Sequence, residues 1–207
     1  DVHGLYERYK KLIGPGCPPS IQVGDMGLGF RRTSGYRAGE FTQNPPHAKM
    51  KAGNHRFIRG NHDNPGECKK NSQWIADGTI EDGVMFIGGA VSIDAAWRVR
   101  DYSWWEDEEL SDKDLSTLSS LYQENKPRVM ITHECPESIS NILMASAGSA
   151  KFEFPSRTRQ AFEQMLQSHS PELWVFGHWH NSFDFVSGMY KTRFVCLNEL
   201  EYRDDLL

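Results

Sequence analysis

Short apolar segments that each stop at a glycine or a polar residue are the feature that most constrains this chain. They comprise residues 21–23, 56–59, 84–87, 129–132 and 173–176. Lengths of about four residues and a β-branched or aromatic content favour buried strands over pieces of helix. Between them, apolar residues recur at helical spacing in residues 5–13, 111–123, 136–147 and 156–168. Strands that alternate with helices predict a layered α/β fold.

The end of the chain adds an antiparallel element to this pattern. Residues 183–186 and 193–197 are two further apolar segments, and the Ser187-Gly188 turn signal between them predicts a hairpin, so the sheet is expected to be mixed. Residues 27–55 are rich in Gly, Arg, Asn and Pro and predict a long loop with one short helix. No repeat or linker divides the chain, so residues 1–207 are expected to form a single domain, with residues 94–127 as an insertion beside the site.

Composition excludes several classes of protein. The chain has 207 residues, 12% of them aromatic, and a net charge of −5 from 23 Lys+Arg and 28 Asp+Glu, which is unlike a disordered protein. No apolar stretch approaches the roughly 18 residues of a membrane span, so we expect no membrane association. The mild acidity disfavours binding of nucleic acid by bulk charge, although it leaves room for a local basic patch.

The cysteines indicate the compartment. The four cysteines are widely spaced and include no CxxC pair; two disulfides are conceivable, but reduced thiols in a cytoplasmic protein are the favoured interpretation.

Polar residues at the ends of the predicted strands carry the functional signal. The carboxyl ends of strands in an α/β sheet meet at one edge, where ligands bind. The residues found there are Asp25, Asn61, His62, His133, His178 and His180. Asp1 and His3 stand where a preceding strand would end, so we expect further residues upstream of Asp1. Carboxylate, amide and imidazole groups are metal ligands, and their burial without partners would cost too much free energy.

The order of these residues resembles a known family. The motifs are DVHG (1–4), GD (24–25), RGNHD (59–63), TH (132–133) and GHWH (177–180). Together they are similar to the calcineurin-like metallophosphoesterase superfamily, which includes phosphoprotein phosphatases, diadenosine polyphosphatases, cyclic-nucleotide phosphodiesterases and repair nucleases. The resemblance implies a layered β-sandwich of mixed sheets flanked by helices.

The resemblance also implies a binuclear metal site. The implied ligands are Asp1, His3 and His180 for one divalent ion, Asn61, His133 and His178 for the other, and Asp25 as the bridge. A hydroxide shared by two ions about 3.5–4 Å apart would attack the phosphorus atom. His62 is implied as the general acid that protonates the leaving group. Mixed oxygen and nitrogen ligands suit Mn²⁺, which we favour, as well as Fe and Zn²⁺.

The chain also departs from the pattern of the strict serine/threonine phosphatases, which resemble GDxVDRG at the second motif. Leu28 stands where that pattern has an aspartate that orients the catalytic histidine, and Gly29 stands where it has a phosphate-binding arginine. Arg31 and Arg32 are therefore candidates for binding phosphate, because a guanidinium can contact it through two hydrogen bonds, although a structural role is equally compatible.

The segment 94–127 offers a further candidate substrate contact, Trp104. It lies near Trp97, Trp105, Arg98 and Arg100 and could stack on a leaving group; the favoured alternative is that the tryptophans pack this segment onto the core.

These observations favour an enzyme that acts on a phosphate ester of a phosphoprotein or a small molecule. We expect a phosphomonoesterase before a phosphodiesterase or nucleotide pyrophosphatase, because the chain has no appended domain that would cap the site. A binding scaffold that retains the fold without activity is disfavoured, since such scaffolds lose ligands or the catalytic histidine.

Overall fold

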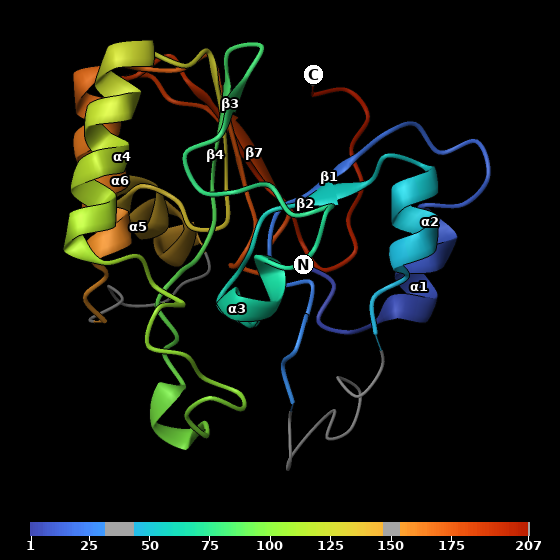
Figure 1. Cartoon of the computed structure of the whole chain (residues 1–207). Coiled ribbons are helices and arrows are strands. Elements are labelled where there is room, and N and C mark those ends of the chain that lie inside the picture. The colour runs from blue at the N-terminus through green and yellow to red at the C-terminus, as the bar shows by residue number, and fades with distance from the viewer. Residues whose placement is uncertain (32–43, 147–153, 207) are drawn as a thin grey trace.

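Two β-sheets with helices on their outer sides make up the protein, whose computed structural model describes residues 1–31, 44–146 and 154–206 (Figure 1). The larger sheet contains β3 (Ile80–Glu81), β4 (Val84–Ile87), β5 (Val129–Thr132), β6 (Leu173–Phe176), β7 (Phe183–Val186) and β8 (Arg193–Cys196). The smaller sheet contains β1 (Ile21–Gln22) and β2 (Arg56–Phe57). The helices are α1 (Tyr6–Leu12), α2 (His47–Ala52), α3 (Pro65–Cys68), α4 (Asp112–Asn125), α5 (Glu137–Ser146), α6 (Arg157–Ser168) and the 3₁₀ helix η2 (Ala95–Trp97).

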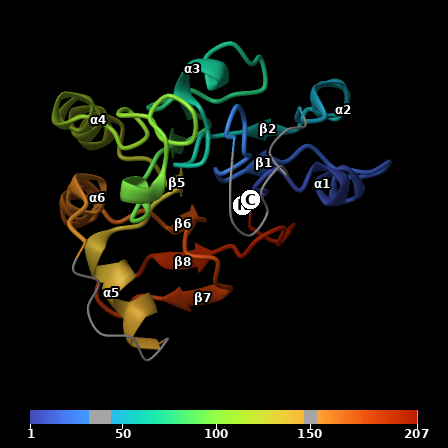
Figure 2. The same ribbon diagram turned by 90° about the horizontal axis from the view of Figure 1, so that it is seen from below.

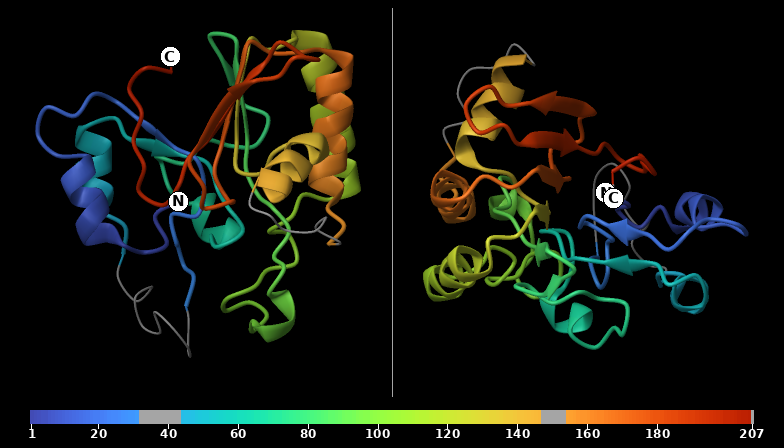
Figure 3. Two further views of the ribbon diagram at one scale, coloured as in Figure 1. Left: turned by 180° about the vertical axis from the view of Figure 1, so that it is seen from behind. Right: turned by 90° about the horizontal axis from the view of Figure 1, so that it is seen from above.

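The elements are arranged in layers. Helices α4, α5 and α6 lie along the outer side of the larger sheet, whereas α1 and α2 lie beyond the smaller sheet (Figures 2 and 3). The two sheets therefore stand between helices, and the expected class of a mixed α/β sandwich flanked by helices is confirmed.

The larger sheet is mixed in the way the sequence predicts. Its strand order is β3-β4-β5-β6-β8-β7, in which β4, β5, β6 and β8 are parallel and the two edge strands are antiparallel. The predicted terminal hairpin is present as β7 and β8, with Val186 opposite Arg193. Strand β3 was not predicted, because two residues are too short to show an alternating pattern.

Side chains of the central strands alternate between two hydrophobic clusters. In β6, Trp174 and Phe176 face the helices, whereas Leu173 and Val175 face the smaller sheet. The same division holds in β5, where Met130 packs under the helices and Ile131 packs with Val23 and Ile58, which directly follow β1 and β2. Burial of both faces explains why these strands are continuously apolar.

Helix α4 lies inside the segment 94–127 that was expected to be an insertion. Ser111 begins the helix by accepting a hydrogen bond from the N–H of Asp114, as the capping pattern predicts. Leu115, Leu118 and Tyr122 are buried in the cluster under the helices, so this helix belongs to the core. The part of the segment before α4, residues 94–110, contains η2 and lies near the carboxyl ends of the strands.

The smaller sheet and its helices complete the sandwich. Strands β1 and β2 pair in parallel, with Ile21 opposite Arg56. Helix α2 is the short helix expected within residues 27–55, although residues 32–43 of that stretch lie outside the described part of the chain. No helix in the described ranges is long and apolar enough to cross a bilayer.

Candidate metal centre

Six of the candidate ligands form two groups that share one carboxylate. The first group is Asp1, His3, Asp25 and His180, and the second is Asp25, His133 and His178; within each group the ligand atoms lie within 4.8 Å of one another. This division is the one that the sequence resemblance implies, with Asp25 common to both. The Asn61 side chain joins the second group, since its Oδ1 lies 3.1 Å from His133 Nε2.

In the first group, imidazole nitrogens and carboxylate oxygens converge. The Nε2 atoms of His3 and His180 are 2.8 Å apart. His180 Nε2 lies 3.1 Å from Asp1 Oδ2, and His3 Nε2 lies 3.6 Å from Asp25 Oδ2. Imidazole nitrogens and carboxylate oxygens are ligands for divalent metal ions, and here they lie close enough together to bind one ion. These residues therefore fit a divalent metal ion.

In the second group, neighbouring atoms fix the orientation of each ligand. His133 Nδ1 lies 2.8 Å from the carbonyl oxygen of Val23 and donates to it, which leaves Nε2 as the atom that faces Asp25 Oδ1 at 3.3 Å. The Asn61 Nδ2 donates to Ser92 Oγ at 3.0 Å, so the amide oxygen is directed towards His133. Such outer hydrogen bonds are typical of metal-binding histidines.

Several of these residues have a left-handed backbone. The φ angles are 48° at His3, 56° at Asp25, 66° at His178 and 47° at His180. A residue other than glycine adopts this conformation at a cost, and such residues concentrate at functional sites. In each case the turn follows an apolar segment or a chain end and directs the side chain towards the centre.

Buried surroundings set the protonation of the centre. Burial lowers the pKa of His3 and that of His178 to about 4, so both imidazoles are neutral near pH 7, which is the form that binds metals. Burial opposes ionisation of Asp25, but the neighbouring His133, His62 and His3 together hold the pKa of its carboxyl well below the usual range. Burial therefore keeps His3 and His178 neutral, whereas the charged Asp25 carboxylate raises the pKa of His133 despite its burial.

Gly60 lies against the shared carboxylate and gives a test that removes no ligand. A Cβ atom there would clash with Asp25 Oδ1 and with the Asp25 backbone nitrogen. We expect Gly60→Ala to weaken metal binding by about 10- to 100-fold, the range seen when groups that orient ligands are changed. Metal titration by calorimetry measures this loss. Gly188→Ala is the matched control, since a Cβ at Gly188 meets nothing within 4 Å; equal metal affinity of the two variants would contradict the close packing at Asp25.

Asp63 is part of the GNHD motif but binds backbone rather than metal. One carboxylate oxygen accepts the N–H groups of Gly27 and Leu28, each at 2.8 Å, and the other accepts those of Met26 and Gly60, at 3.1 and 2.8 Å. Burial raises the pKa of this carboxyl to about 6, and the charge of Asp25 adds to the shift. Asp63 therefore joins the two loops that carry Asp25 and Asn61.

Replacing this carboxylate by an amide gives a stability prediction. In Asp63→Asn, the NH₂ group faces two buried N–H donors whichever way the amide is turned. Unsatisfied buried donors cost about 1–3 kcal/mol each, so we expect a loss of about 2–4 kcal/mol in the free energy of unfolding, measured in urea. The control is Asp204→Asn on the exposed surface. An unfolding midpoint equal to that of the control would contradict the role of Asp63.

His62 lies beside both groups and has neighbours of its own. Its backbone N–H donates to Asp25 Oδ1 at 2.7 Å, and its ring stacks on Phe30 at a centroid distance of 4.8 Å. Its Nε2 lies 2.6 Å from Arg98 Nη2. Burial lowers the pKa of His62, so the ring is neutral in this arrangement, and Nε2 accepts from the guanidinium because arginine has no acceptor.

Of the three predicted substrate contacts, the two in the described part of the chain do not line the cavity at the metal centre. Arg31 is exposed and lies over the Tyr102 ring at 5.7 Å, and Arg32 lies outside the described residues. Trp104 is half-buried, and its backbone pairs with that of Arg100. Neither Arg31 nor Trp104 is among the described residues that line the cavity at the metal centre. The alternative interpretation, that the tryptophans pack this segment onto the core, is the one the structure supports for Trp105, which is buried against Phe30.

Several residues that the sequence did not single out contact the candidate ligands or their neighbours. Glu134 is buried, and its Oε2 lies 3.8 Å from His178 Nε2, while its Oε1 accepts from Trp179 Nε1 at 2.8 Å. In the sequence, the only indication of this role for Glu134 was its position directly after His133. Ser92 and Arg98 come from residues 92–98, where no motif marks them, so only the fold reveals their position.

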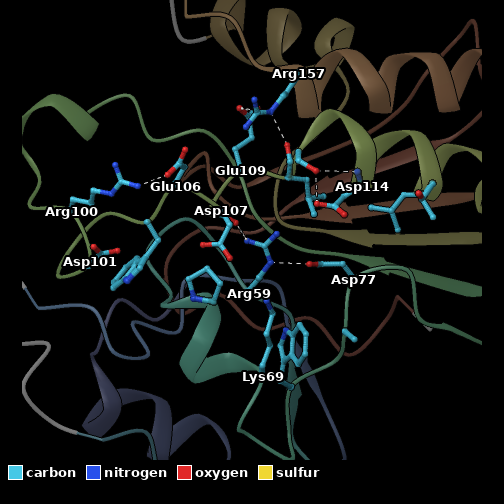
Figure 4. Close-up of a pocket in the computed structure, with 18 residues that line it drawn as sticks. Arg59, Lys69, Asp77, Arg100, Asp101, Glu106, Asp107, Glu109, Asp114 and Arg157 are labelled. Atoms are coloured by element: carbon cyan, nitrogen blue, oxygen red, sulfur yellow. Dashed lines mark hydrogen bonds and ion pairs between the residues drawn. The ribbon is translucent and has the colours of Figure 1, made fainter.

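Two cavities differ in the residues that line them. A cavity of about 420 Å³ adjoins the metal centre and is lined by Asp25, Asn61, His62, Ile93, Asp94, Met144, Arg159, His178, Trp179 and His180. A larger cleft of about 850 Å³ includes none of the candidate ligands. Figure 4 shows the Arg59–Asp77 ion pair at 2.8 Å on its wall. Arg59 also donates to the carbonyls of Asp107 and Glu108, which gives this buried arginine a structural role.

Comparison with known families agrees with this geometry. Residues 1–182 match the family described as calcineurin-like phosphoesterase. The chain belongs to the calcineurin-like phosphoesterase family. Among curated proteins, none matches the chain. For this phosphoesterase, membership implies metal-dependent hydrolysis of phosphoesters, and the two groups of Asp and His residues are suited to bind divalent metal.

Proposed function

We propose that the protein is a phosphomonoesterase that uses two divalent metal ions. The observation that carries the proposal is the position of Asp25, whose carboxylate is common to two groups of ligands. Bound there, the ions would lower the pKa of a water molecule towards neutrality and offset the negative charge of the phosphoryl group.

The residues of the chain would bind the two ions and protonate the leaving group. We assign Asp1, His3 and His180 to one ion, Asn61, His133 and His178 to the other, and Asp25 to both. Asp25 offsets the mutual repulsion of the two cations. His62 lies next to the centre without belonging to either group, and we assign it as the general acid that protonates the leaving-group oxygen. Mn²⁺ is the proposed metal, with Fe and Zn²⁺ as alternatives.

We expect the substrate to bind in the cavity of about 420 Å³ that adjoins the centre. Ile93 and Met144 line this cavity together with the polar residues, so the organic part of an ester can contact apolar side chains beside the phosphoryl site. A phosphodiester or a dinucleotide polyphosphate is the alternative substrate, and it would use the same apolar wall for a second substituent.

A metal-restoration assay with a substrate panel tests the proposal. Chelation is expected to abolish hydrolysis and lower the melting temperature, because a ligand that binds only the folded state stabilises it. Addition of Mn²⁺ should restore both properties, and p-nitrophenyl phosphate or a phosphopeptide should be cleaved faster than bis-p-nitrophenyl phosphate or a dinucleotide polyphosphate. Preferential cleavage of the bis ester would favour the diesterase. Absence of hydrolysis with every metal and ester, and equal behaviour of wild type and His62→Ala, would favour a scaffold.

A further inference from the structure

Arg98 lies at the edge of the metal centre, between two consecutive residues of the GNHD motif. One terminal nitrogen, Nη2, is 2.6 Å from His62 Nε2. The other, Nη1, is 2.9 Å from Ser92 Oγ and 3.3 Å from the carbonyl oxygen of Asn61. The guanidinium thus contacts the proposed general acid and the backbone of a proposed metal ligand at once.

The loop that contains η2 holds this guanidinium in place. The Arg98 side chain is only 6% exposed, and Nη2 forms an ion pair with Asp94 at 2.6 Å. Glu108 is farther away, with its Oε2 3.8 Å from Nη1. The face of Phe30 lies 5.3 Å from the guanidinium carbon, and the same ring stacks on His62. Arg98 and His62 are therefore positioned by one aromatic side chain.

The hydrogen bonds of Arg98 leave it able to bind an anion. Its Nε is buried and has no hydrogen-bond partner among the described residues. Nη2 pairs with Asp94 and also donates to an imidazole nitrogen, a neutral acceptor whose place a negatively charged phosphoryl oxygen can take. While Nη2 holds His62 Nε2, that nitrogen cannot donate a proton.

We propose that Arg98 binds the phosphoryl group of the substrate, exchanging His62 Nε2 for a phosphoryl oxygen. The exchange would free His62 Nε2 from the guanidinium. The inference rests on the proposed function, since it names the cation that recognises the substrate of the same centre.

Other arginines among the described residues are less suited to this role. Arg159 lines the cavity at the metal centre, but it contacts Glu134 and the carbonyl of Phe154. Arg59 is committed to Asp77 in the larger cleft, and Arg31 lies on the exposed surface. The sequence position where a phosphate-binding arginine was sought, Gly29, carries no side chain, so an arginine from another loop can supply the charge.

Binding of inorganic phosphate to the metal-loaded protein tests the proposal without relying on turnover. Arg98→Ala is expected to raise the dissociation constant for phosphate by about 10- to 100-fold, the loss of one or two hydrogen bonds to a charged group. Arg98→Lys should recover part of the affinity, because lysine keeps the positive charge but cannot donate two parallel hydrogen bonds as a guanidinium does. Arg100→Ala is the matched control: Arg100 lies on the same loop but is exposed and paired with Glu106, so affinity should stay within about twofold of wild type.

Metal content and the unfolding midpoint of each variant separate a local effect from a folding defect; where Arg98→Ala fails to fold, Arg98→Lys provides the comparison. Equal phosphate affinity in wild type and the Arg98 variant, with a reduced kcat, would overturn the proposal and leave Arg98 as a group that only positions His62. A wild-type protein that binds phosphate through Arg98 but hydrolyses no ester would contradict the proposed function and support this inference. A metal-loaded wild type that binds no phosphate would overturn the inference.

Discussion

Asp25→Asn is expected to abolish metal-dependent hydrolysis and to leave the protein unable to hold two metal ions. Asp25 is 1% exposed and is the one carboxylate shared by both groups of ligands. The amide has almost the same shape but no charge, so the cations lose the anion between them. Because a metal ion contributes several kcal/mol to the transition state, we expect kcat/KM to fall on the order of a thousandfold or more. The measurements are metal content after gel filtration and turnover of p-nitrophenyl phosphate.

Asp204→Asn is the matched control for this substitution. It makes the same chemical change at an exposed residue and should keep both the metal content and the activity of wild type. An Asp25→Asn protein that retains two ions and wild-type turnover would show that Asp25 does not bridge the metals.

His62→Ala is expected to lower turnover by about 10²–10⁴-fold for an ester with a poor leaving group, while both metals stay bound. The reason is geometric: His62 Nε2 lies 4.0 Å from Asp25 Oδ2, beside the centre, and His62 belongs to neither group of ligands. An ester with a good leaving group needs little protonation, so p-nitrophenyl phosphate should be affected much less than phenyl phosphate. Steady-state kinetics on this pair of substrates provides the measurement.

The control for His62 is His47→Ala. His47 lies at the start of α2 and is exposed, with a hydrogen bond to Asn71, so its removal should leave both substrates unaffected. Equal losses for the two leaving groups in His62→Ala would contradict the assignment as general acid. Loss of a metal ion would instead identify His62 as a ligand.

The sequence predicted the core sheet well because local pattern and burial coincide there. Strand β6 is apolar at every position, with Gly177 directly after it, and both of its faces are covered in the structure. The two-residue strand β3 was missed because its backbone pairs with β4 while its side chains are half-buried or exposed. Helix α4 was assigned to an insertion because most of its residues are polar. Only three of its side chains, Leu115, Leu118 and Tyr122, are buried in the core.

The grouping of the candidate metal ligands was also predictable, because five of them follow strands whose carboxyl ends share one edge: Asp25, Asn61, His133, His178 and His180. The contacts around His62 were not. Arg98 reaches His62 from 36 positions away, and neither residue type nor spacing indicates which of the nearby arginines does so. The same limit applies to Trp104, for which a substrate contact was predicted although it does not line the cavity at the metal centre. Long-range side-chain contacts depend on how loops pack, which local patterns do not encode.

The most direct test of catalysis by two metal ions is the rate of p-nitrophenol release from p-nitrophenyl phosphate as metal-free protein is titrated with Mn²⁺. We expect no activity without metal and a rate that rises until two ions are bound per chain. Hydrolysis that is independent of added metal, or a rate that is complete at one ion per chain, would contradict catalysis by two metal ions.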